Sequence, residues 1–212
     1  MATQAPSSER RAAGGLALVA IGSILAALWY GTLRMPSARW LPDYGPVPPF
    51  RLVDQQQHAV TNAHLTGSVW VADFIFTRCA GQCPLMSGRM AQLQAAFRDE
   101  PRVRLVSLSV DPARDTPQVL ADYASAYQAD PARWRFLTGD IEAVRRLSQD
   151  GFHLGLSEGG TAAEPILHSV KLVLVDPQGS IRGYYDSTDA KALRQLQADA
   201  RQLARRGSNG RR

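Results

Sequence analysis

The chain has 212 residues, of which 45% are hydrophobic and 20% charged, and this ordinary globular composition excludes a chain disordered throughout, a collagen-like repeat and a polytopic membrane protein. Its two cysteines exclude a disulfide-rich scaffold and any four-cysteine zinc or iron–sulfur site within one chain. The net charge of +5 lies at the ends, because residues 200–212 carry +5, residues 1–11 carry +1 and the remainder carries −1, so we expect no nucleic-acid partner.

No charged side chain occurs over the 22 positions of residues 12–33. A helix of that length spans roughly 33 Å, enough to cross a hydrocarbon core of about 30 Å. We therefore predict a single transmembrane helix that anchors the chain in the lipid bilayer at residues 12–33, after a cytoplasmic segment at residues 1–11. The alternative is a cleaved signal peptide, although the run is long for one and no clear A-x-A site follows it. Both interpretations place the main domain on the outer side, in the bacterial periplasm or an equivalent compartment.

Composition divides the rest of the chain into three parts. Residues 34–49 are rich in proline and are interpreted as an extended linker. Residues 50–205 are expected to form the folded domain, which is long enough to bury a core. The basic tail at residues 206–212 is expected to be disordered.

Hydrophobic patterning within the domain predicts alternating strands and helices. Residues 69–76 form a nearly continuous apolar run, which is typical of a strand buried on both faces, and Thr116 followed by Pro117 is typical of a helix start. The expected elements are a small hairpin at 50–53 and 60–61, a strand at 69–76, a helix at 84–97, a strand at 103–110, helices at 116–127 and 141–149, a hairpin of strands at 167–175 and 181–185, and a closing helix at 190–205. This order predicts an α/β, thioredoxin-like fold with one inserted helix.

The two cysteines, Cys79 and Cys83, lie between a predicted strand and a predicted helix. Functional groups gather at the carboxyl ends of strands in open α/β sheets, and a helix N-terminus stabilises a thiolate. Pro84 suits a first helical position, which places Cys83 at the cap, and Gly81 gives the loop freedom to bring the sulfurs together. The pair is therefore predicted to act as a reversible dithiol or a metal site.

Three interpretations of this pair differ in chemistry. A purely structural disulfide is one, but a loop with three intervening residues gives little entropic benefit. A reversible dithiol is the second. The third is a Cu(I) site, because the two thiolates are soft ligands that suit this ion. A zinc site would need four ligands, so histidines or carboxylates would have to complete the set.

Of the four histidines, His58, His64 and His153 are interpreted as solvated, packing or capping residues. His168 begins the strand of the terminal hairpin. In a thioredoxin-like sheet this strand runs antiparallel to the cysteine-bearing strand, so its start lies beside the other's end. His168 is therefore expected to approach Cys79 and Cys83, which would give a trigonal copper site of two sulfurs and one nitrogen.

The strings DFIFTRCAGQCP, LVSLSVDPARDTPQVLADYA, FLTGD and EPILHSVKLVLVDPQGSIRGYYD resemble the SCO/SenC family of thioredoxin-like copper proteins over residues 50–200. The resemblance implies that Cys79, Cys83 and His168 hold a copper ion, as Cu(I) or alternatively Cu(II). It also implies assembly of the binuclear copper centre of cytochrome c oxidase. The expected partners are then the copper-bearing oxidase subunit and other copper chaperones or thiol reductants. One departure from the family pattern is residues 80–82, where many members have a proline after the first cysteine.

Two functions follow from this resemblance. The first is a membrane-anchored copper chaperone, and the second is a thiol–disulfide oxidoreductase in which Cys79 and Cys83 reduce the acceptor's cysteines. A peroxidase is a third alternative, because related thioredoxin-like folds host that chemistry. Asp111 matches the family pattern and follows the second buried strand, so it is expected either to support the metal ligands by hydrogen bonding or to cap the turn before Pro112.

Overall fold

The computed structural model describes residues 40–79, 81–154, 157–158, 166–167 and 170–209. The predicted anchor at residues 12–33 and the predicted ligand His168 lie outside the described residues. Within these ranges we find no helix that combines the length and apolar character needed to cross a membrane.

Residues from Trp40 onward form one compact unit built on a mixed sheet of seven strands. Across the sheet the strands run in the order β2-β1-β5-β4-β3-β8-β9. The strands of this sheet are β1 (Arg51–Asp54), β2 (Ala59–Thr61), β3 (Val69–Ile75), β4 (Val103–Ser109), β5 (Trp134–Thr138), β8 (Lys171–Val175) and β9 (Ile181–Asp186). A separate two-stranded sheet pairs β6 (Ser157–Glu158) with β7 (Ile166–Leu167).

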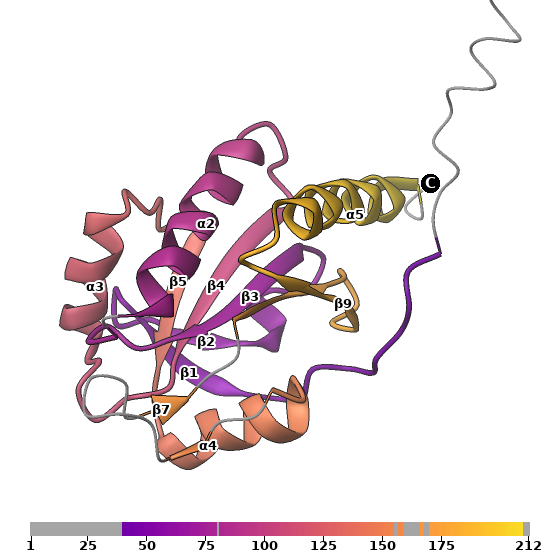
Figure 1. The fold of residues 1–212 in the computed structure, drawn as a ribbon. Coiled ribbons are helices and arrows are strands. Elements are labelled where there is room, and N and C mark those ends of the chain that lie inside the picture. Colours follow the sequence, from indigo (N-terminus) through magenta and orange to yellow (C-terminus); the bar gives the residue numbers. More distant parts are fainter. Residues whose placement is uncertain (1–39, 80, 155–156, 159–165, 168–169, 210–212) are drawn as a thin grey trace, which may run out of the picture. The chain divides into compact units, whose positions relative to one another are not determined.

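The helices cover both faces of the sheet. Figure 1 shows α4 on the side away from α2 and α3. Tyr123 of α3 packs against Phe136 of β5, while Phe152, just after η2, packs edge-on against Trp70 and Phe74 of β3. The helices are η1 (Asn62–His64), α2 (Gln82–Ala96), α3 (Pro117–Ala126), α4 (Ile141–Arg146), the π-helical turn η2 (Leu147–Gly151) and α5 (Ala190–Asn209).

Strand β3 forms the centre of the core. All seven of its residues are buried, because β4 pairs with it in parallel on one side and β8 pairs antiparallel on the other. Both faces of the sheet are covered, so an almost continuous apolar run is the pattern expected for such a strand. The strand is therefore a rigid support for the loop that follows Ile75 and carries the cysteines.

Several predicted elements are confirmed, and several boundaries differ. The hairpin β1–β2, the strands β3 and β4, and the start of α3 at Pro117 lie where the sequence predicts them. Helix α5 continues to Asn209, past its predicted end, and the strand predicted at 167–175 is divided between β7 and β8. The hydrophobic pattern predicts no strand at β5, although it pairs with β4 on one side and β1 on the other.

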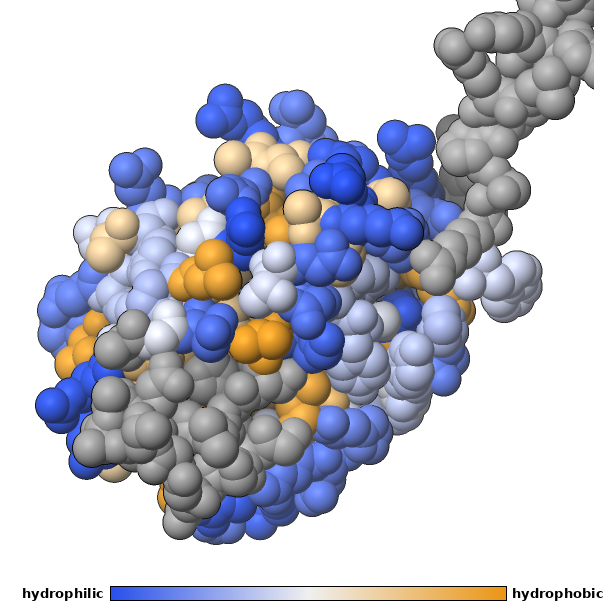
Figure 2. Space-filling model, in the orientation of Figure 1, coloured by the Kyte–Doolittle hydropathy of each residue, from blue (hydrophilic) through white to orange (hydrophobic). Residues whose placement is uncertain are grey.

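The segment before β1 packs on the domain. Leu41 and Val47 are buried in the core, and Val47 donates its amide to the carbonyl of Gly179 in the β8–β9 turn. The compact unit thus includes residues that the sequence assigned to a linker. Figure 2 shows that the visible face of the domain is mostly hydrophilic, with small separate groups of apolar side chains.

Candidate functional site

The two cysteines come together at the end of β3. The amide of Cys83 donates to Sγ of Cys79 at 3.5 Å, and the amide of Cys79 donates to the carbonyl of Phe76 at 3.2 Å. Both residues are thiols, and both are buried, with Cys79 at 7% exposure and Cys83 at 0%. The loop therefore brings the backbone of Cys83 to the sulfur of Cys79, and the meeting of the two sulfurs stays a prediction.

Helix α2 begins at Gln82 rather than at Pro84, with Gly81 as its N-cap. Cys83 consequently lies in the first helical turn and not at the cap, as the sequence had suggested. Pro84 still fits there, because amides in the first turn have no partner within the helix and the proline has none to satisfy. The N-terminal end of α2 thus presents its positive dipole end to the thiol pair.

Burial opposes this favourable dipole at Cys83. Desolvation raises the pKa of the Cys83 thiol well above its usual range, although a hydrogen bond with the backbone of Phe76 acts in the other direction. The Cys79 thiol and the Asp73 carboxylate raise this pKa further. The metal-free pair is therefore held as neutral thiol at Cys83, and loss of this proton must accompany metal binding or oxidation.

Asp73 is a buried carboxyl group that the sequence analysis did not single out. It lies in the middle of β3 at 0% exposure, and its Oδ1 accepts a 2.6 Å hydrogen bond from Ser107 Oγ, which in turn accepts from Trp134 Nε1 at 2.9 Å. Burial raises the pKa of Asp73 to about 7. An acidic residue within an otherwise apolar strand is the signal that would have identified it.

Asp111 and Asp115 follow β4 at the same edge of the sheet. Asp111 binds Arg114, with 3.0 Å between its Oδ2 and Nη1, and its role in supporting the metal ligands stays a prediction. Asp115 is fully buried and accepts hydrogen bonds from Thr77, two residues before Cys79. The sequence analysis singles out Asp111, whereas it is Asp115 that accepts hydrogen bonds from the loop that carries the cysteines.

Three of the four histidines lie within the described residues. His58 lies 3.7 Å from Asp54, and Nδ1 of His64 accepts the amide of Thr61 at 3.1 Å, so both have local roles in the β1–β2 region. His153 is exposed and has a φ of 52°. His168, the predicted third ligand, lies outside the described residues.

The direction of β8 agrees with the reasoning that led to His168. Ala72 pairs with Val173 and Trp70 pairs with Val175, so β8 runs antiparallel to β3. The N-terminal end of β8 therefore lies toward the end of β3 that continues to Cys79. Within the described ranges, three or more His, Cys, Asp or Glu side chains nowhere gather in a way that could hold a metal ion.

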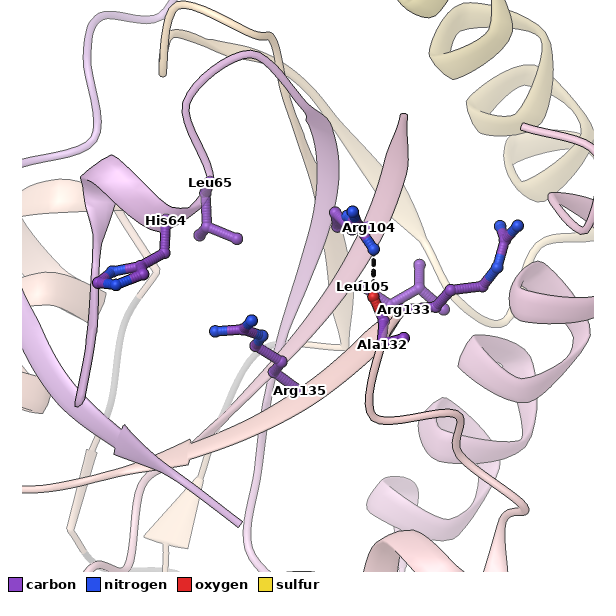
Figure 3. Close-up of a pocket in the computed structure, with 7 residues that line it drawn as sticks. All are labelled: His64, Leu65, Arg104, Leu105, Ala132, Arg133 and Arg135. Atoms are coloured by element: carbon purple, nitrogen blue, oxygen red, sulfur yellow. Dashed lines mark hydrogen bonds between the residues drawn. The ribbon is translucent and has the colours of Figure 1, made fainter. Parts of the chain in front are cut away.

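A pocket of about 290 Å³ lies apart from the thiols, at the start of β4 and β5 (Figure 3). Arg104 donates to the carbonyl of Ala132 there, and Figure 3 shows Arg133 pointing away from Arg135. Arg133 donates to backbone carbonyls at the end of α2, including that of Phe97 at 2.8 Å. The basic side chains of this pocket therefore diverge, and some already bind backbone oxygens.

Together, the sheet order, the parallel β3–α2–β4 unit, the terminal hairpin and the adjacent thiols define a thioredoxin-like protein with a C-x-x-x-C dithiol. The SCO1/SenC family model matches residues 43–204, and the chain belongs to this family.

Relatives agree with this assignment. A putative copper-binding protein of Stutzerimonas stutzeri is 37% identical over 153 residues, which cover 68% of this chain and 71% of the relative. The structure of BsSco, described as having a disulfide switch and belonging to the Sco family of cytochrome c oxidase assembly proteins, is 29% identical, covers 78% of this chain and 96% of that one, and superposes with a TM-score of 0.69. ScoI of Bradyrhizobium japonicum with copper bound is 25% identical, covers 75% and 99% of the two chains, and has a TM-score of 0.64.

Proposed function

We propose that this protein is a membrane-anchored copper chaperone that delivers copper to the binuclear centre of cytochrome c oxidase. In this proposal Cys79, Cys83 and His168 bind one Cu(I) ion as cargo. The copper then passes to thiolates of the copper-bearing oxidase subunit by stepwise ligand exchange. Residues 12–33 hold the domain at the outer face of the membrane.

The observation that carries the proposal is the contact between the two cysteines at the start of α2. The 3.5 Å hydrogen bond from the Cys83 amide to Cys79 Sγ holds the Cys79 sulfur against the first turn of α2, in which Cys83 lies. Two thiolates are soft donors that suit Cu(I) better than hard cations. Their burial restricts water and oxidants, which favours retention of a cuprous ion until an acceptor approaches.

The third ligand rests on strand direction and on the family resemblance. Strand β8 runs toward the cysteine end of β3, and His168 lies three positions before Lys171, the first residue of β8. The copper-binding descriptions of the relatives support a copper site in the same family. A nitrogen ligand beside two sulfurs would complete a three-coordinate Cu(I) site.

A competition titration tests this function. The reduced full-length protein in detergent is titrated with Cu(I) against a chromophoric Cu(I) chelator, beside Cys79→Ser, Cys83→Ser and His168→Ala. The wild type should bind one equivalent, and each variant should bind much more weakly. His58→Ala is the matched control, because His58 is exposed and lies next to Asp54. Wild-type affinity in all three ligand variants would refute the proposed site.

The second candidate function is a thiol–disulfide oxidoreductase that reduces the acceptor's cysteines. The favouring observation is that the Cys79 sulfur accepts the backbone amide of Cys83 within one short loop. One thiolate would attack the target disulfide and the other would resolve the mixed disulfide, which oxidises this pair and reduces the target. Because this exchange needs no histidine, His168→Ala should lower copper affinity and leave disulfide reduction largely intact. Equal loss of both activities would contradict this division.

A further inference from the structure

The carboxylate of Asp115 is held in place by hydrogen-bond donors from two different segments. Thr77 donates its hydroxyl to Oδ1 at 2.6 Å and its amide to Oδ2 at 3.2 Å, and Ser109 donates its hydroxyl to Oδ2 at 2.6 Å. Asp115 has 0% exposure. A buried carboxylate is costly unless it is well hydrogen-bonded, so these three bonds are strongly maintained.

Asp115 does not need Thr77 to hold its own loop. The amides of Arg114 and Asp115 both donate to the carbonyl of Asp111, at 3.0 and 2.9 Å, and Thr116 caps α3 through the amide of Val119. These bonds define the turn between β4 and α3 locally. The bonds from Thr77 instead join residues 38 positions apart in the chain, and they fasten the loop after β3 to the loop after β4.

Thr77 transmits this restraint to the thiols. It lies inside the tight turn in which the Cys79 amide donates to the carbonyl of Phe76 at 3.2 Å. With both the amide and the hydroxyl of Thr77 fixed by Asp115, the turn has little freedom to rotate. Cys79 Sγ in turn accepts the Cys83 amide, so the position of Thr77 governs how the Cys79 sulfur lies against the first turn of α2.

We propose that Asp115 is a positioning residue that acts through Thr77. It holds Cys79 in the geometry in which Cys79 and Cys83 can bind one metal ion or form a disulfide. This inference rests on the proposed function of the pair as a copper and redox site. It assigns to Asp115 no contact with copper and no transfer of a proton. Its effect is to keep the two thiols preorganised and so to favour every reaction that uses both.

The test is the dithiol–disulfide equilibrium of the full-length protein in glutathione buffers. Oxidised glutathione takes two electrons and two protons from Cys79 and Cys83, which gives the intramolecular disulfide and two molecules of reduced glutathione. Thr77→Val removes the hydroxyl and keeps the branched shape. It should shift this equilibrium toward the dithiol by about threefold or more. Thr77→Ser retains the hydroxyl and should restore the wild-type value.

Ser109→Ala is the matched control, because it removes the bond from Ser109 to Oδ2 of Asp115 and leaves both donor groups of Thr77 unchanged. It should lower the midpoint of urea unfolding and leave the glutathione equilibrium unchanged. Asp115→Asn provides a second variant of the carboxylate itself. If Thr77→Val and Asp115→Asn only reduce stability, with an unaltered equilibrium, the bond is merely structural and the inference is overturned.

Failure of the inference and failure of the proposed function give different results. The glutathione equilibrium depends on the two cysteines and can be measured without copper. A wild-type protein that binds no Cu(I) would refute the chaperone function and leave the Thr77 result intact. A protein that binds Cu(I) normally in every Thr77 and Asp115 variant, with normal equilibria, would refute only the positioning role.

Discussion

The amide of Cys83 donates to the sulfur of Cys79 at 3.5 Å, so the first turn of α2 is bonded directly to the loop that precedes it. The two thiols nevertheless have different surroundings. Cys79 retains 7% exposure and Cys83 has none, and burial raises the pKa of Cys83. Any partner that approaches from solvent therefore meets Cys79 first.

This asymmetry predicts unequal alkylation. In the reduced, metal-free protein at neutral pH, iodoacetamide should modify Cys79 about tenfold or more faster than Cys83, because only a thiolate reacts and Cys83 is both buried and protonated. Mass spectrometry of quenched time points measures the two rates. In urea the two rates should become similar. Equal rates in the folded protein would show that the burial of Cys83 does not limit its reactivity.

The raised pKa of Asp73 should make the free energy of unfolding depend on pH. Its folded pKa of about 7 lies above the ordinary value of 3.8, so the folded state holds a proton that the unfolded state releases between these limits. The free energy of unfolding should therefore fall as pH rises through this window, by on the order of 3 kcal/mol between about pH 5 and about pH 8. Asp73→Asn should remove most of this fall.

Urea denaturation of the metal-free wild type and Asp73→Asn at the two pH values measures the difference. The carboxyl groups elsewhere contribute equally to both proteins and cancel in the comparison. A wild-type stability that rises through the same range, or a variant with an unchanged slope, would contradict the assignment to Asp73.

Strand β9 has no room for a side chain at Gly183. A Cβ at this position would lie 2.6 Å from the hydroxyl of Tyr185, which donates to Asp199 at 2.8 Å. Gly183→Ala should therefore displace the Tyr185 ring and destabilise the domain by about 1–3 kcal/mol in urea denaturation. Gly88→Ala is the control, because nothing lies within 4 Å of its added Cβ and alanine favours the helix. Equal effects of the two changes would argue against a clash.

The sequence predicts the parts of this domain whose signals are local. The apolar run of β3 and the Thr116–Pro117 start of α3 each identify an element without reference to the rest of the chain. Strand β5 lacks such a signal, because Arg135 interrupts a short apolar segment. Its stability comes instead from pairing with β4 on one side and β1 on the other, which the sequence does not reveal.

The candidate site divides in the same way. Cys79 and Cys83 are identifiable from their residue type and their place between a strand and a helix. Asp73 and the Asp115–Thr77 bonds depend on which strands are neighbours, since Asp73 pairs across β3 and β4 with Ser107 and Asp115 reaches a loop 38 positions away. Such groups become visible only once the register and the order of the strands are known.

The most direct test of the account is X-ray absorption spectroscopy of the Cu(I)-loaded full-length protein at the copper edge. The account predicts two sulfur neighbours and one nitrogen neighbour, at distances near the zinc values of about 2.3 and about 2.0 Å. His168→Ala should lose the nitrogen contribution, and His58→Ala should leave the spectrum unchanged. A His168→Ala spectrum identical to that of the wild type would show that this histidine does not bind the copper.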